Sequence, residues 1–221
     1  MLAIQLHDRI IENKDWATIL FIICVAIIAI NKTISSVRFN EFVRLAYSDK
    51  YTKIYRDSSN LMSGFTISMF VLQLISFSFF TLLVLNQFHR AEKTDLIVYI
   101  QIFTFLSVFI LSKFLIEKII ATAFKIEEFN EQFNLLKVNY RTYLSLLLLP
   151  ITIILFYNPI ASPTFFRVLI VLLFTLNVVT YIVALKLYQN LLLRKIFYFI
   201  LYLCTLEIAP YYFIYNWFTK N

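Results

Sequence analysis

Glycine is nearly absent from this chain of 221 residues, and Gly64 is the single one. Phosphate-binding loops need several glycines, so a P-loop and a dinucleotide-binding fingerprint are both excluded. Histidine is also scarce, because His7 and His89 are the only two and lack the paired spacing of a zinc site. The two cysteines, Cys24 and Cys204, lie inside apolar runs, which argues against a disulfide framework. We therefore expect neither a cofactor nor a metal.

Charged residues are few as well. They make up 15% of the chain, whereas hydrophobic residues make up 61%. Soluble proteins average about 25% charged and roughly 45–50% apolar residues, so this composition does not fit a soluble domain. Apolar runs of about 18 residues or more are typical of membrane-spanning helices. The formal net charge of +7 is then explained by basic loops on one side of a bilayer, and we expect no nucleic-acid partner.

The apolar runs predict an all-α fold, with one membrane domain over residues 1–221 and six transmembrane helices. The first run is the weakest, because its fully apolar part covers only about 15 residues. The stretch before it, "HDRIIENKD", is net negative, so we expect an anchoring helix rather than a cleaved signal peptide. The predicted spans are residues 16–34, 62–85, 96–116, 142–157, 165–187 and 196–218.

Lysine and arginine are unevenly divided between the two sides of this map, with fourteen on one side and six on the other. Basic loops resist translocation, so the richer side is predicted to be cytoplasmic and both termini periplasmic. The richer side holds Lys32, Arg38, Arg44, Lys50, Lys53, Arg56, Lys113, Lys118, Lys125, Lys137, Arg141, Lys186, Arg194 and Lys195. The other side holds Arg9, Lys14, Arg90, Lys93, Arg167 and Lys220.

Two predicted cytoplasmic segments, residues 37–57 and 117–140, show the apolar periodicity of amphipathic helices. The first is basic and aromatic, which fits either a helix lying in the membrane interface or a docking surface for a partner helix. The second has its positive charge neutralised by glutamates, so lipid is a poorer target for it. It fits either a contact with a partner or a second copy, or a helix folded back on its own bundle.

One carboxylate, Glu207, lies near the centre of the sixth predicted span, where an acid costs on the order of 2.5–3.5 kcal/mol. Pro210 follows three residues later and removes a backbone donor, which predicts a kink beside Glu207. Gln73 and Asn177 lie at a similar depth, and Lys113 is a possible counter-ion nearer the cytoplasmic edge. These groups form either polar contacts between helices or a protonatable site.

The segment "FYFILYLCTLEIAPYYFIYNW", with six apolar spans and an outward C-terminus, resembles a domain-of-unknown-function family of uncharacterised polytopic membrane proteins. That family belongs to Gram-negative bacteria of the Bacteroidetes group. The resemblance is strongest over residues 197–215, which include Tyr202, Cys204, Glu207 and Pro210. It implies a multi-pass protein of the bacterial inner membrane, and it transfers no catalytic residue.

Three functional hypotheses follow. The first is a non-enzymatic subunit or assembly factor of a cell-envelope complex, with the lipid bilayer and a membrane protein or a second copy as partners. The second is a small proton-coupled transporter that uses Glu207 with Gln73 and Asn177. The third is an intramembrane lipid-modifying enzyme, which requires a second catalytic group at the depth of Glu207. The sequence offers no convincing candidate for that group, and we expect a non-enzymatic role.

Overall fold

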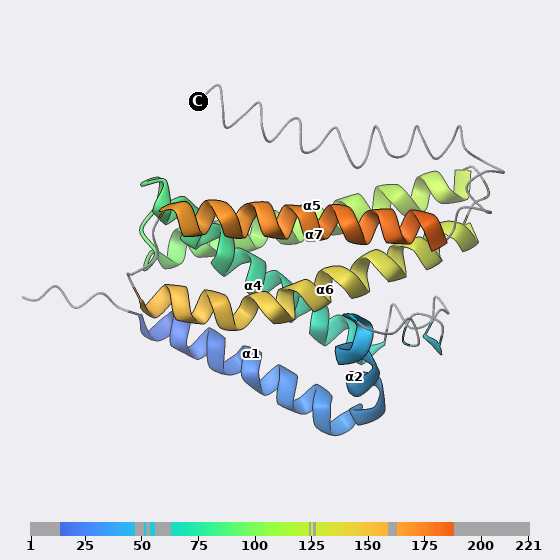
Figure 1. Ribbon diagram of the computed structural model, residues 1–221, viewed down its shortest axis with the longest axis horizontal. Helices are drawn as coiled ribbons and strands as arrows, with labels where there is room; N and C mark the ends of the chain where they lie inside the picture. The colour runs from blue at the N-terminus through green and yellow to red at the C-terminus, as the bar shows by residue number, and fades with distance from the viewer. Residues whose placement is uncertain are drawn as a thin grey trace, which may run out of the picture.

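The computed structural model describes residues 14–46, 51, 54–55, 63–123, 125, 127–158 and 163–187. Every regular element within those ranges is helical, which confirms the predicted all-α class. Five of the helices are long and apolar enough to cross a membrane, which indicates a membrane protein (Figure 1). The sixth predicted span, residues 196–218, lies outside the described residues. The elements are α1 (Asp15–Ile34), α2 (Ser36–Val43), the short 3-10 helix η1 (Arg44–Ala46), α4 (Gly64–Gln87), α5 (Leu96–Ala123), α6 (Glu127–Tyr157) and α7 (Pro163–Leu187).

Helix α1 covers the weak first apolar run, and α6 extends well beyond the fourth predicted span. Helix α1 has 20 residues, so at about 1.5 Å per residue it reaches roughly 30 Å, the thickness of the hydrocarbon layer. Helix α6 has 31 residues, and the predicted fourth span, residues 142–157, is only its C-terminal half. Its N-terminal half belongs to the segment that the sequence marks as amphipathic.

The ends of α4 are set by local hydrogen bonds. Ser63 is the N-cap, and its side-chain oxygen accepts from the backbone N–H of Thr66 at 3.4 Å. After Gln87 the chain leaves the helix through His89, whose φ of 54° is left-handed. The N–H of His89 donates to the Asn86 carbonyl and the N–H of Arg90 donates to the Leu85 carbonyl, each at 3.0 Å. This is a Schellman motif with histidine at the position that usually holds glycine.

A second left-handed residue separates α5 from α6. Lys125 has a φ of 54°, and its N–H donates to the Thr122 carbonyl at 3.2 Å. The predicted amphipathic segment 117–140 is therefore divided between two helices, although it contains neither glycine nor proline. Phe133 and Leu136, which belong to its apolar stripe, are buried within the bundle, whereas Ile119 is exposed. The part of the stripe on α6 thus packs on its own chain.

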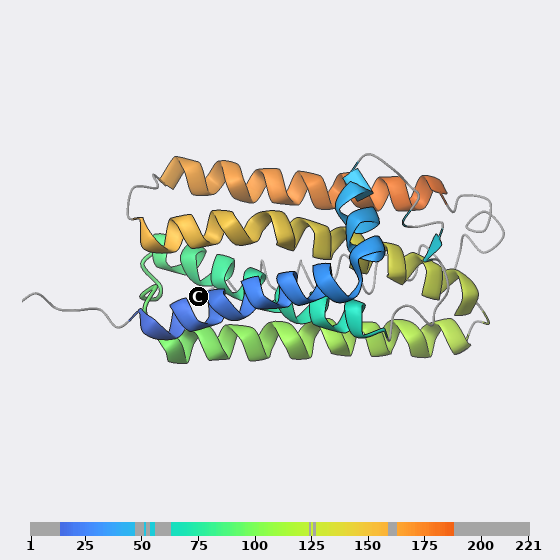
Figure 2. The same ribbon diagram turned by 90° about the horizontal axis from the view of Figure 1, so that it is seen from below.

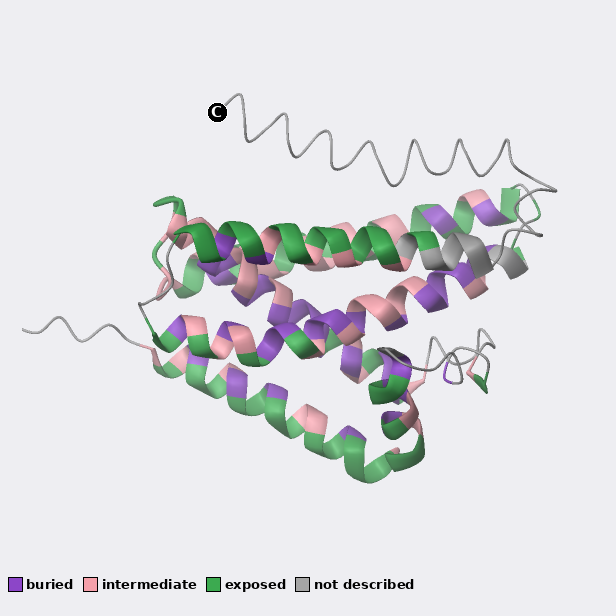
Figure 3. Ribbon diagram, in the orientation of Figure 1, coloured by how far each residue is buried: buried purple, intermediate pink, exposed green. Residues whose placement is uncertain are grey.

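Helix α4 lies at the centre of the bundle and contacts α1, α5, α6 and α7. Within its apolar window 56% of the residues are buried, against 6% for α5 and 11% for α7. Figure 2 shows α5 and α7 on opposite sides of α4 and α6. Their outward faces are largely exposed and apolar, as expected for helices in contact with lipid (Figure 3).

An aromatic cluster holds the bundle together at the end where α1 begins. Phe79 of α4 is fully buried, and its ring centroid lies 4.3 Å from that of Phe21 and 4.6 Å from that of Tyr99. Trp16 stacks on Phe79 at 5.7 Å and donates its indole N–H to the Thr94 carbonyl at 3.1 Å. This residue is therefore packed into the bundle, beyond the interfacial anchoring that tryptophan commonly provides.

The first prediction concerns this cluster. Replacing Phe79 by alanine removes a buried ring at the contact of four helices and is expected to cost about 3–5 kcal/mol. The matched control is Phe105→Ala on α5, where the ring is 59% exposed and removal leaves no internal cavity. Thermal unfolding of both variants in the same detergent tests the difference. Equal shifts of the unfolding midpoint would contradict the placement of Phe79 at the core.

Candidate functional site

The residues that the sequence singles out do not meet in the described part of the chain. Gln73 is 1% exposed on α4, and its Oε1 accepts from the Thr142 hydroxyl of α6 at 2.9 Å. Asn177 lies on the exposed side of α7, and its amide donates to the Leu173 carbonyl of the same helix at 3.2 Å. Glu207 and Pro210 lie outside the described residues. Gln73 is thus occupied by an interhelical bond.

Lys113, the possible counter-ion of Glu207, has a different carboxylate beside it. Its Nζ lies 4.0 Å from Oε1 of Glu117, one helical turn further along α5. Lys137 of α6 reaches the same oxygen at 3.1 Å, and its Nζ also lies 4.9 Å from the ring centroid of Phe133. Glu117 is only 3% exposed, so its charge is stabilised mainly by these two lysines.

This ion cluster forms the wall of a pocket of about 160 Å³ between α4, α5 and α6. Three cationic side chains and one carboxylate line it, which leaves an excess of two positive charges. Most of the remaining lining residues are apolar. The lining residues are Thr66, Ile67, Phe70, Ile110, Leu111, Lys113, Phe114, Glu117, Asn134, Lys137, Val138 and Arg141.

Asn134, which lines the pocket, has one polar atom without a partner among the described residues. Asn134 is 2% exposed, and its Nδ2 donates to Oδ1 of Asn130 at 3.3 Å. This bond fixes which way the carboxamide points. Its Oδ1 is buried and has no hydrogen-bond partner among the described residues. A buried acceptor left in this state costs about 1–3 kcal/mol, so the site is suited to a donor from outside the chain.

Arg38 joins α2 to the same end of the bundle, which we call the basic end after Arg38, Lys113, Lys137 and Arg141. Its guanidinium donates to Ser63 Oγ at 2.8 Å and to Thr66 Oγ1 at 3.1 Å. The same group lies 4.8 Å from the ring centroid of Phe65, a cation–π contact. Thr66 also lines the pocket, so the contact of Arg38 and the wall of the pocket share a residue.

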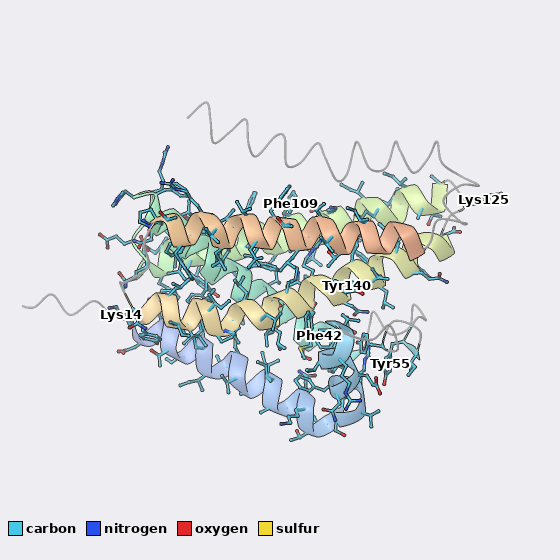
Figure 4. The ribbon with its side chains drawn as sticks, viewed as in Figure 1. Lys14, Phe42, Tyr55, Phe109, Lys125 and Tyr140 are labelled. Atoms are coloured by element: carbon cyan, nitrogen blue, oxygen red, sulfur yellow. The ribbon has the colours of Figure 1, made fainter. Side chains whose placement is uncertain are left out.

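Aromatic packing accompanies this contact. Phe42 of α2, which is labelled in Figure 4, is 1% exposed. Its ring centroid lies 5.9 Å from that of Phe65 and 6.1 Å from that of Tyr143. Tyr51 is equally buried, and its hydroxyl accepts from Arg38 Nε at 3.3 Å. Burial raises the pKa of the Tyr51 phenol, and the bond from Arg38 lowers it in part, so the hydroxyl stays neutral at physiological pH. The apolar face of α2 is thus covered by the chain itself.

Sequence reasoning used Lys137, Arg141 and Arg38 only as markers of sidedness and missed Glu117 and Asn134 altogether. A signal was available in the spacing. Lys113 and Glu117 are four residues apart, as are Lys137 and Arg141, so each pair lies on one face of a helix. The sequence does not reveal that the face of α5 opposes the face of α6, because the turn between these helices at Lys125 contains neither glycine nor proline to mark it.

The second prediction concerns Arg38. Lysine keeps the charge but cannot donate to two hydroxyls from one planar group, so Arg38→Lys is expected to loosen α2 by about 1.4 kcal/mol. A thiol introduced by Leu45→Cys, in a background without Cys24 and Cys204, reports this loosening because Leu45 is 2% exposed. Its maleimide labelling should become about tenfold faster. The control Arg44→Lys, at an exposed position, should leave the rate unchanged.

The third prediction concerns Glu117. Glu117→Leu leaves the two lysines without their shared carboxylate and is expected to cost about 3–5 kcal/mol. Lys137→Met alone should also destabilise the protein. The double variant should lose clearly less free energy of unfolding than the sum of the losses of the two single variants. Unfolding measurements on the four proteins give the coupling energy. Additive losses would show that the contact between Lys137 and Glu117 contributes nothing.

Comparison with known proteins identifies a family and no function. No curated protein and no solved structure matches the chain. A family model described as a domain of unknown function, DUF4271, matches residues 17–218. The match covers nearly the whole sequence and all five apolar helices except the first two residues of α1. The chain therefore belongs to the DUF4271 family.

Proposed function

We propose that this protein is a non-enzymatic subunit or assembly factor of a cell-envelope complex. It resides in the bacterial inner membrane as a multi-pass protein with both termini periplasmic. The gathering of Arg38, Lys113, Lys137 and Arg141 at one end of the bundle supports this orientation, because basic residues favour the cytoplasmic side.

The observation that carries the proposal is the way in which polar side chains are used inside the bundle. Gln73 bonds to Thr142, and the Ser76 hydroxyl donates to the Ser145 carbonyl at 3.0 Å, so two polar contacts join α4 to α6. The Ser68 hydroxyl donates to Oδ1 of Asn31 at 2.9 Å and joins α4 to α1. Each such bond stabilises helix packing by about 0.6–2 kcal/mol. These groups serve the packing of a scaffold.

Helix α5 offers the surface that a partner subunit requires. Leu111, Leu115 and Ile119 follow the spacing of one helical face and are 50%, 58% and 68% exposed. Ile119 follows Lys118 and lies beyond residue 116, where the apolar run of this helix ends. An isoleucine at headgroup depth is better covered by protein than by water, since burying apolar area stabilises by about 25 cal/mol per Å². We assign this face to a membrane helix of another subunit.

The fourth prediction tests this assignment by crosslinking in native membranes. A photoreactive residue at position 119, followed by affinity purification, should capture one protein in stoichiometric yield. The same residue at position 22 of α1, where the isoleucine is 63% exposed, should capture lipid only. Glu207→Gln, which keeps shape and hydrogen bonding, should not change the yield. Recovery of the chain alone from position 119 would contradict the proposal.

A proton-coupled transporter is the second candidate, and Asn177 is the observation that favours it. A carboxamide on the exposed side of an apolar helix is costly in lipid unless a polar group faces it. Under this candidate Glu207 carries the proton and faces Asn177. Uptake into proteoliposomes would then depend on a pH gradient and be abolished by Glu207→Gln, a change that the subunit proposal tolerates.

A further inference from the structure

The pocket at the basic end lies at the depth of lipid headgroups. Helix α5 enters the bilayer near Leu96, and Lys113 follows 17 residues later, about 26 Å along the helix axis. The hydrocarbon layer is roughly 30 Å thick, so Lys113 and Glu117 lie where hydrocarbon gives way to headgroups. Arg141 and Lys137 of α6 line the same pocket and therefore share this depth.

The lining divides into a charged part and an apolar part. Lys113, Lys137 and Arg141 surround the single carboxylate of Glu117 and leave the pocket positive, which favours an anion. Ile67, Phe70 and Ile110 belong to the parts of α4 and α5 that lie in hydrocarbon, so this wall suits an acyl chain. A ligand that matches both parts is an anionic amphiphile.

Asn134 narrows the chemistry of the headgroup. Its buried Oδ1 accepts hydrogen bonds only, whereas a phosphate diester carries no donor to offer. The headgroup must therefore present a hydroxyl or an ammonium donor besides its phosphate. Because the pocket has an excess of two positive charges, a hydroxyl is favoured over an ammonium group. A cavity of about 150 Å³ accommodates a six-carbon ring, so the 160 Å³ here has room for a phosphate and part of a glycerol.

We propose that this pocket binds an anionic glycerophospholipid with a hydroxylated headgroup, of the phosphatidylglycerol class. The phosphate lies among Lys113, Lys137 and Arg141, and a headgroup hydroxyl donates to Oδ1 of Asn134. The acyl chains follow the apolar wall of α4 and α5 into the bilayer. The site shares Leu111 with the partner surface on α5 but needs neither Leu115, Ile119 nor Glu207, so its test can fail while the proposed function stands.

The fifth prediction is tested by native mass spectrometry of the full chain in detergent. Phosphatidylglycerol, phosphatidic acid, phosphatidylethanolamine and phosphatidylcholine with identical acyl chains are added in turn. Phosphatidylglycerol should bind at least about tenfold more tightly than the two zwitterionic lipids, which corresponds to one charge-assisted hydrogen bond. Equal retention of all four lipids would overturn the proposal.

Two variants separate the parts of the site. Arg141→Gln should weaken phosphatidylglycerol and phosphatidic acid alike by about tenfold. Asn134→Leu keeps the size of the side chain and should weaken phosphatidylglycerol by about fivefold while leaving phosphatidic acid unchanged, because only the former has the headgroup hydroxyl. Arg167→Gln on the exposed surface of α7 is the matched control and should change neither.

Soluble glycerol phosphate provides the last arm of the experiment. Bound lipid should resist millimolar concentrations of it, because the acyl chains contribute to lipid affinity through burial against the apolar wall. Displacement by glycerol phosphate would assign the pocket to a soluble phosphate and overturn the lipid assignment. Retention of wild-type affinity by Arg141→Gln would likewise overturn it, since the phosphate would then lie elsewhere.

Discussion

Hydrocarbon offers no hydrogen-bond partners, and this constraint governs the architecture of the chain. Backbone groups are satisfied within helices, and most polar side chains inside the described spans bond to a neighbouring helix or to their own backbone, with Oδ1 of Asn134 among the exceptions. Helix α4 supplies much of the contact surface, because it packs against α1, α5, α6 and α7. This central helix joins its neighbours in two ways. Gln73 and Ser76 form hydrogen bonds to α6, and Phe79 packs against the rings of other helices.

At the basic end the helices also carry charged side chains, and a buried charge there is stabilised by neighbouring groups of opposite charge or by hydrogen bonds. Glu117 is buried yet shared by two lysines, and Arg38 donates to two hydroxyls that cap and flank the start of α4. The N-cap Ser63 thus serves the helix and the docked α2 at once. Thr66 accepts from Arg38 and also lines the pocket, so the two clusters share this residue.

The helices were largely predictable, because apolar runs of this length in a chain with so few charges can form little other than membrane-spanning helices. What escaped prediction depends on tertiary placement. The reversal at Lys125 uses a left-handed lysine where periodicity indicates continuous helix, and it lets α6 pack against α4. Glu117 and Asn134 were missed for the same reason, since neither residue type is informative until the helices beside it are known. The sequence placed Gln73 near the middle of the membrane, but it did not identify Thr142 as the hydrogen-bond partner of Gln73.

The pairing of α4 with α6 bears on the order in which the protein is made. Helix α6 is the least apolar of the five long helices and contains Pro150, so it enters a bilayer less readily by itself than the others do. The Thr142 hydroxyl donates to Gln73 of α4, and the Ser145 backbone carbonyl accepts from Ser76 of α4, which precedes α6 along the chain. During synthesis α4 has therefore already left the ribosome when α6 emerges. The hydrogen-bond partners of α6 on α4 are thus available when α6 inserts into the bilayer.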